Sequence, residues 1–154
     1  ILIYKLNTSN LIFDFARKLS KLTGRKIVAL NFDVVDQMKT PDIKGVYSAS
    51  VEEFLGYIKY ADYVVTNSFH GTAFAINFGI DFLTLARFSE KSKESENSRV
   101  KSILELLNFD DRFIVSDTIS FTVEIDKEKW KKCEMLLEKK REESKQYLDN
   151  ILKA

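Results

Sequence analysis

The segment from Ala61 to Gly79 constrains the fold of this chain more than any other. It opens with a short apolar, β-branched run, Tyr63 to Val65, which predicts a fully buried strand. The polar residues Thr66 to Thr72 follow, and a helical segment then runs to Gly79, a residue typical of helix C-caps. In α/β proteins such a turn binds ligands, because it lies outside the carboxyl end of a strand, beside the free amides of a helix.

Strands and helices alternate along the rest of the chain. Short apolar runs predict further strands at residues 1–6, 26–31, 82–86 and 112–116. Amphipathic spacing and capping residues predict helices at 10–22, 50–60, 100–108 and 126–152. Residues 32–47 contain the only proline and lack a clear period, so we expect a loop with one short element there. The alternation predicts a three-layer α/β sandwich with a mostly parallel, Rossmann-like sheet.

The predicted domain organisation has two parts. Residues 1–125 form the Rossmann-like α/β domain, and residues 126–154 form a long helix that packs on it. Five residues share one side of that helix, namely Trp130, Cys133, Leu137, Leu148 and Ile151. The chain begins at Ile1 in the middle of a strand, so we expect it to be a piece of a longer protein whose N-terminal domain is absent.

Composition excludes several classes of function. The chain has 154 residues, 24 of them basic and 23 acidic, and this balance argues against a nucleic-acid partner. No apolar run approaches the roughly 20 residues of a transmembrane segment. One histidine and one cysteine allow neither an internal disulfide nor a zinc cluster, and the single cysteine fits a cytoplasmic location. The turn after the first strand lacks the glycines of a dinucleotide-binding oxidoreductase and the acidic pair of a response regulator.

The turn after Val65 carries residues that could do chemistry. Imidazole is the side chain best suited to give and take a proton near neutral pH, and His70 is the only histidine. Hydroxyls of Ser68 and Thr72, with the amides of a helix start, would hold a phosphate or carboxylate, and Gly71 would let it approach the backbone. The same polar residues are also what a helix cap and a turn require without any ligand.

A second polar segment, residues 87–98, is too hydrophilic to pack and predicts a surface loop. It ends at Asn97 and Ser98, which precede Arg99 at the start of a helix. A guanidinium there could bind a carboxylate or phosphate through two parallel hydrogen bonds. An acidic partner within the protein would explain Arg99 equally well.

The turn TNSFHGT, after a strand that begins with Ala-Asp, resembles the polysaccharide pyruvyl transferase family. Asn97-Ser98-Arg99-Val100, the leucine-rich helix that follows and Asp111-Arg112 are similar to the same family. The resemblance runs over residues 1–154 and implies the C-terminal half of a two-domain, GT-B-type enzyme of exopolysaccharide biosynthesis. It implies His70 as the catalytic residue. The substrate-binding residues that it implies are Asn67, Ser68, Gly71, Thr72, Asn97, Ser98 and Arg99.

The resemblance also implies the reaction and its partners. Phosphoenolpyruvate would be the donor substrate, with no cofactor and no metal, and its pyruvate would become a cyclic ketal on two hydroxyls of a saccharide or lipid-linked saccharide. The chain's own N-terminal domain would complete the site, so we expect this fragment alone to be inactive. Two alternatives stay open: a GT-B glycosyltransferase that uses a nucleotide sugar, and a non-catalytic Rossmann-like interaction module.

Overall fold

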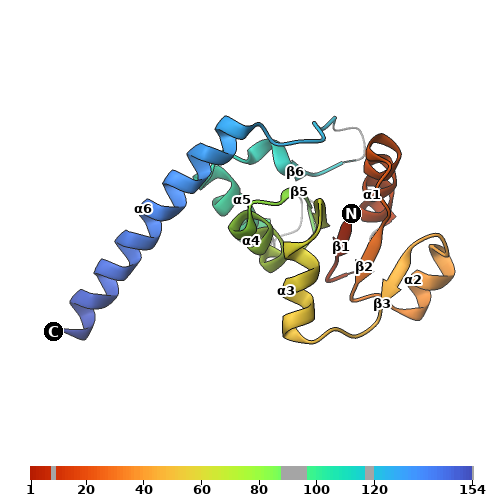
Figure 1. Cartoon of the computed structure of the whole chain (residues 1–154), viewed down its shortest axis with the longest axis horizontal. Coiled ribbons are helices and arrows are strands. Elements are labelled where there is room, and N and C mark those ends of the chain that lie inside the picture. Colours follow the sequence, from red (N-terminus) through yellow and green to blue (C-terminus); the bar gives the residue numbers. More distant parts are fainter. Residues whose placement is uncertain (8–9, 88–96, 117–119, 154) are drawn as a thin grey trace.

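A single sheet organises the molecule. The structure, a computed structural model, describes residues 1–7, 10–87, 97–116 and 120–153. Within them six parallel strands pair in the order β3-β2-β1-β4-β5-β6 (Figure 1). The strands are β1 Leu2–Tyr4, β2 Val28–Leu30, β3 Lys44–Val46, β4 Tyr63–Thr66, β5 Asp81–Leu85 and β6 Phe113–Ile114. The order reverses between β1 and β4, and the carboxyl ends of these two strands therefore flank the crevice in which doubly wound folds bind ligands.

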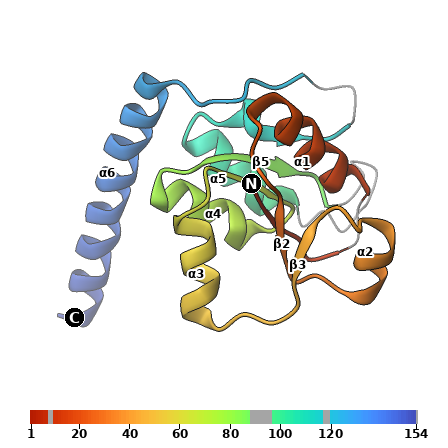
Figure 2. The same cartoon turned by 45° about the vertical axis from the view of Figure 1, so that its right-hand side comes forward.

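Helices cover both faces of this sheet (Figure 2). They are α1 Asn10–Thr23, α2 Val34–Lys39, α3 Val51–Lys59, α4 Phe69–Phe78, α5 Asn97–Leu106 and α6 Lys127–Leu152, with a short 3₁₀ turn, η1, at Asp110–Arg112. Along β1 the side chain of Ile3 packs with α1, whereas Leu2 and Tyr4 pack with α3 and α4 on the opposite face. The predicted α/β class and its parallel, Rossmann-like sheet are confirmed.

Residues 32–47 differ from the prediction, because they form both a helix, α2, and an edge strand, β3. Asp33 and Asp36 make a capping box, and Asp36 is fully buried against Lys5, with Nζ and Oδ2 2.7 Å apart. The residue of α2 that is buried is thus the charged Asp36, so the sequence of this helix lacks the apolar spacing by which a helix is recognised. The middle residue of β3 is Gly45, since the ring of Phe32 occupies the space of a side chain there. That strand therefore lacks the apolar signal by which strands are recognised.

Two helix boundaries can be compared with the prediction. Gly79 ends α4 in the left-handed conformation, with φ 66°, as its position after the helical segment predicted. α5 begins at Asn97, three residues earlier than the apolar spacing from Val100 indicated. Residues 88–96 of the predicted surface loop lie outside the described residues. The last strand, β6, is shorter than the predicted 112–116.

The long helix α6 has two unlike halves. Its first turns pack on the α4 and α5 side of the sheet, where Cys133 is fully buried and the indole of Trp130 donates to Asp81 Oδ1 at 3.0 Å. Its second half extends beyond the body of the molecule (Figure 1), so Leu148 and Ile151 are 56% and 54% exposed. The side of the helix that these two residues were predicted to share with Trp130 and Cys133 is therefore packed only in the first turns. The division into residues 1–125 and 126–154 stays a prediction.

Candidate functional site

The segments that follow β1 and β4 are joined by the side chain of Asn67, the first residue after β4. Asn67 is 4% exposed. Its Oδ1 accepts the amide of Leu6 at 2.9 Å, and its Nδ2 donates to Asn7 Oδ1 at 2.5 Å. The turn after β4 therefore holds the segment after β1, and both sides of the crevice are joined by one carboxamide.

The hydroxyl groups of Thr66 and Ser68, the residues on either side of Asn67, also make hydrogen bonds within the turn. Thr66 Oγ1 donates to the carbonyl of Tyr4 at 2.6 Å and accepts the amide of Ser68 at 3.1 Å. Ser68 is the N-cap of α4, and its own hydroxyl accepts the amide of Gly71 at 3.4 Å. The Ser68 side chain is thus engaged in capping, and the ligand contact predicted for it stays a prediction.

Gly71 and Thr72 face the sheet. A Cβ at Gly71 would lie 2.5 Å from Thr66 Oγ1 and 3.0 Å from Tyr4 Cδ1, so the close approach at this glycine is between helix and strand. The buried Thr72 hydroxyl donates to the Ser68 carbonyl at 3.0 Å and lies 2.8 Å from Thr84 Oγ1 on β5. Both residues therefore fix α4 on the sheet, and a role for them in binding substrate stays a prediction.

His70 is exposed at the second position of α4. The amides of Phe69 and His70 occupy the first turn of the helix, where an N–H has no partner within the helix. No acidic residue lies in that turn, so the positive end of the helix dipole is not neutralised by the helix itself. This end of α4 offers an anion two backbone donors beside an imidazole.

The second predicted motif divides at the start of α5. Asn97 is buried, and its Oδ1 accepts the amide of Arg87 at 3.0 Å. Ser98 and Arg99 are exposed, and the guanidinium of Arg99 lies 5.7 Å from the centre of the Phe69 ring. The Phe69 and His70 rings are also 5.7 Å apart, so the Phe69 ring is near both candidate groups. The structure thus brings Arg99 to the start of α4, whereas Asn97 bonds to the backbone of Arg87.

A cavity of about 470 Å³ opens at the carboxyl ends of β1, β2 and β3, and we call it the carboxyl-edge cavity. Its lining consists of Tyr4, Leu30, Asn31, Tyr47, Ser48, Ala49, Ser50, Val51 and Phe54. Tyr4 also contacts the position of Gly71, so this cavity adjoins the turn before α4. The sequence did not predict this cavity, because its residues come from the ends of three strands and from a segment without hydrophobic periodicity.

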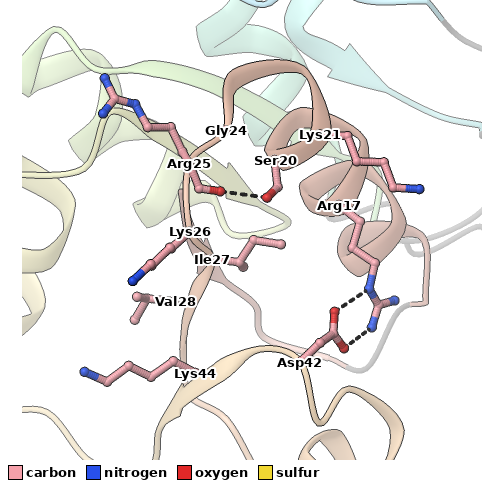
Figure 3. A pocket seen from close by; sticks show the side chains of 10 residues that line it. All are labelled: Arg17, Ser20, Lys21, Gly24, Arg25, Lys26, Ile27, Val28, Asp42 and Lys44. Carbon is pink, nitrogen blue, oxygen red and sulfur yellow. Dashed lines mark hydrogen bonds and ion pairs between the residues drawn. The ribbon is translucent and has the colours of Figure 1, made fainter.

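A larger cavity, about 720 Å³, lies at the opposite, amino edge of the sheet (Figure 3). Five basic residues line this amino-edge cavity, namely Arg17, Lys21, Arg25, Lys26 and Lys44. Its one acidic residue, Asp42, binds Arg17 through two hydrogen bonds of 2.8 and 3.0 Å. In Figure 3 Lys26 and Lys44 extend to one side of the strands and Lys21 to the other, so these ammonium groups do not converge on one ligand.

Other reactive groups have structural surroundings. Burial raises the pKa of the Cys133 thiol to about 11, which leaves it protonated and unreactive near neutral pH. Within the described part of the chain, no group of three or more His, Cys, Asp or Glu side chains is placed to hold a metal ion. None of the helices described is both long and apolar enough to cross a bilayer.

Comparison with known proteins gives one match. The family model for polysaccharide pyruvyl transferase matches residues 3–89, more than half of the chain. The matched span includes the turn from Asn67 to Thr72 and all residues of the carboxyl-edge cavity, and it ends before Asn97 to Arg99. No curated protein matches the chain.

Proposed function

Because the chain belongs to the polysaccharide pyruvyl transferase family, we propose that it binds phosphoenolpyruvate at the start of α4. The single observation that carries this proposal is the exposed His70 on a helix end whose first turn has no acidic residue and whose first two amides have no partner among the described residues. The family is a family of transferases. Within the matched span, the start of α4 is where a group that can transfer a proton lies beside donors that can bind an anion.

The donor carries two anionic groups, and two features near Phe69 match them. The amides of Phe69 and His70 would accept one group through hydrogen bonds strengthened by the helix dipole. The guanidinium of Arg99, exposed 5.7 Å from the Phe69 ring, would pair with the other. Phosphate and carboxylate would then lie on either side of the imidazole.

The proposed reaction needs one group that donates and then accepts a proton. One sugar hydroxyl adds to C2 of the enolpyruvate while the imidazolium of His70 gives a proton to the C3 methylene, which becomes a methyl group. The proton of the attacking hydroxyl returns to the imidazole. Phosphate then leaves C2, the second hydroxyl bonds there in its place, and its proton leaves with the phosphate. The sum is ketal plus inorganic phosphate, with His70 restored.

The wider context of the chain is also a proposal. We infer that it is the C-terminal half of a GT-B-type enzyme of the cytoplasm. An N-terminal domain would then form the second wall of the crevice, and the acceptor would be a saccharide or a lipid-linked saccharide. On this reasoning the 154-residue chain binds the donor but does not turn it over.

Titration of the ¹⁵N-labelled chain tests the proposal. Phosphoenolpyruvate should shift the backbone amide signals of Phe69, His70 and Gly71, whereas uridine and guanosine diphosphate sugars should not. Inorganic phosphate controls for a general response to anions, and it should bind more weakly because it lacks the carboxylate that pairs with Arg99. Shifts from the nucleotide sugars alone would reject the proposal in favour of a glycosyltransferase, and no shift from any of the ligands would remove the donor site.

A further inference from the structure

The carboxyl-edge cavity offers a ligand different chemistry from the start of α4. None of its nine described lining residues carries a charge. Beside aliphatic side chains, the lining presents three aromatic rings, a carboxamide and two serine hydroxyls: Tyr4, Tyr47, Phe54, Asn31, Ser48 and Ser50. The volume of about 470 Å³ lies within the range of pockets that hold small organic molecules.

The helix end at this cavity is already neutralised. α3 begins after Ser50, whose amide donates to Glu53 Oε2 at 2.8 Å and whose hydroxyl donates to Glu52 Oε2 at 2.9 Å. These two carboxylates occupy the positive end of the α3 dipole, so a second anion would meet repulsion there. The start of α4 has no such residues. An anionic ligand is therefore favoured at α4 and an uncharged one in the cavity.

Tyr47 provides a fixed aromatic surface at the cavity. Its ring makes an edge contact with Phe32, with centroids 6.1 Å apart, and its hydroxyl donates to Gln37 Oε1 at 3.2 Å. The residue is nevertheless 59% exposed, so much of the ring stays open. A ring held in place at both ends is suited to stack on the apolar face of a sugar ring, because little side-chain freedom is lost on binding.

Asn31 adds a directed polar group. Its backbone lies in the left-handed region, with φ 53°, a conformation that asparagine tolerates better than most residues. Its Nδ2 donates to the carbonyl of Lys5 at 2.9 Å, which sets the direction of the side chain. In the part of the chain described, its Oδ1 accepts no hydrogen bond, so it can accept one from a ligand hydroxyl.

We propose that the carboxyl-edge cavity binds an uncharged saccharide, with Tyr47 as the stacking ring and Asn31 as a hydrogen-bonding group. The inference deepens the proposed function and rests on it in one respect, since it places the acceptor sugar on this chain beside the donor. The link is Tyr4, which lines the cavity and lies against Gly71 in the first turn of α4.

The test uses methyl glycosides of glucose, galactose and mannose as probes, added to the ¹⁵N-labelled chain. At least one of them should shift the amide signals of Asn31 and Ser48 to Val51, whereas the methyl glycoside of glucuronic acid should bind more weakly. Tyr47→Ala should weaken the glycoside roughly three- to tenfold, the loss expected for one aromatic contact. Tyr47→Phe keeps the ring and should restore binding. Tyr60→Ala changes a still more exposed tyrosine, at the C-cap of α3, and should leave binding unchanged.

A second variant covers the case in which Tyr47→Ala does not fold. Ser48→Trp fills the cavity from an exposed position and should abolish glycoside shifts while phosphoenolpyruvate still shifts Phe69 to Gly71. Glycoside shifts located elsewhere, equal binding by Tyr47→Ala, or equal binding of the glucuronide would overturn the inference. Glycoside shifts without any response to phosphoenolpyruvate would support the saccharide site and count against the donor site alone.

Discussion

The two edges of the sheet carry cavities of opposite character. At the amino edge the larger cavity is lined by five basic residues, of which Lys26 and Lys44 extend to one side of the strands and Lys21 to the other. At the carboxyl edge the smaller cavity has an uncharged lining and adjoins a helix end with an exposed histidine. Judged by volume and charge alone, the ligand site would be placed at the amino edge. The candidate functional groups lie together at the carboxyl edge, which is also where a doubly wound sheet leaves its crevice.

The difference has a physical origin in the direction of the helices. Every described strand pairing is parallel, so the helices that follow β3 and β4 start at the carboxyl edge, and their free amides point there. The amino edge receives the carboxyl ends of α1 and α3, where lysines such as Lys21 and Lys59 complement the negative end of the dipole. Of the five basic residues that line the amino-edge cavity, Lys21 is therefore accounted for by the helix dipole, without a ligand.

The largest effect that separates the two edges is expected at His70. In the complete enzyme His70→Gln should lower the rate of pyruvyl transfer on the order of 10²- to 10⁴-fold, because glutamine cannot exchange a proton with the substrate. Lys26→Gln at the amino edge is the matched control and should leave the rate unchanged. The measurement is release of inorganic phosphate in the presence of acceptor. Equal losses in both variants would break the distinction between the edges.

A smaller effect is expected at Gly71. In Gly71→Ala the new methyl group would meet Thr66 Oγ1 at 2.5 Å, and we expect a loss of about 1–3 kcal/mol in the free energy of unfolding. Gly56→Ala within α3 has open space around the new Cβ and should instead stabilise the protein by up to about 1 kcal/mol. Urea unfolding of both variants provides the comparison. Two variants of equal stability would contradict the close fit of α4 on the sheet.

A still smaller effect is expected at the amino edge from the exposed pair of Arg17 and Asp42. A double-mutant cycle should assign it about 0–1 kcal/mol. The hydrogen bond from Arg17 lowers the pKa of the Asp42 carboxyl, so the pair contributes fully above the ordinary pKa of about 3.9. The contribution is lost as the pH falls through the lower pKa of the folded state. Asp42→Asn should therefore destabilise slightly at pH 7 and not at strongly acidic pH, as measured by urea unfolding.

The smallest effect is expected from the lysines of the amino edge. Replacing Lys21, Lys26 and Lys44 together by glutamine should leave binding of phosphoenolpyruvate unchanged in calorimetric titrations. Lys26 and Lys44 extend to one side of the strands and Lys21 to the other, and all three line the amino edge of the sheet, whereas α4 starts at its carboxyl edge. Loss of donor binding in the triple variant would move the anion site from the carboxyl edge to the amino edge.

Much of the fold could be predicted because its signals are local. The run from Tyr63 to Val65, the capping residue Ser50 and the helix stop at Gly79 each determine one element through the residues around them. The edge strand β3 could not be predicted, because Gly45 makes room for Phe32, a residue distant in sequence. The exposure of Leu148 and Ile151 could not be predicted either, because a periodic apolar pattern does not say where the body of the protein ends.

The candidate site could be predicted only in part. The position of His70 after a buried strand pointed to the crevice, and the structure exposes it there. The sequence did not show that Gly71 and Thr72 face the sheet. Their contacts are with Thr66, Tyr4 and Thr84, which strand pairing brings together. The carboxyl-edge cavity was missed for the same reason, since β1, β2 and β3 supply it jointly.

The carboxamide of Asn67 has a consequence for how the crevice responds to a substrate. Its hydrogen bonds to Leu6 and Asn7 tie the turn after β4 to the segment after β1, across the reversal of strand order. The protein itself makes these bonds, so a substrate that reached this turn would not have to order it.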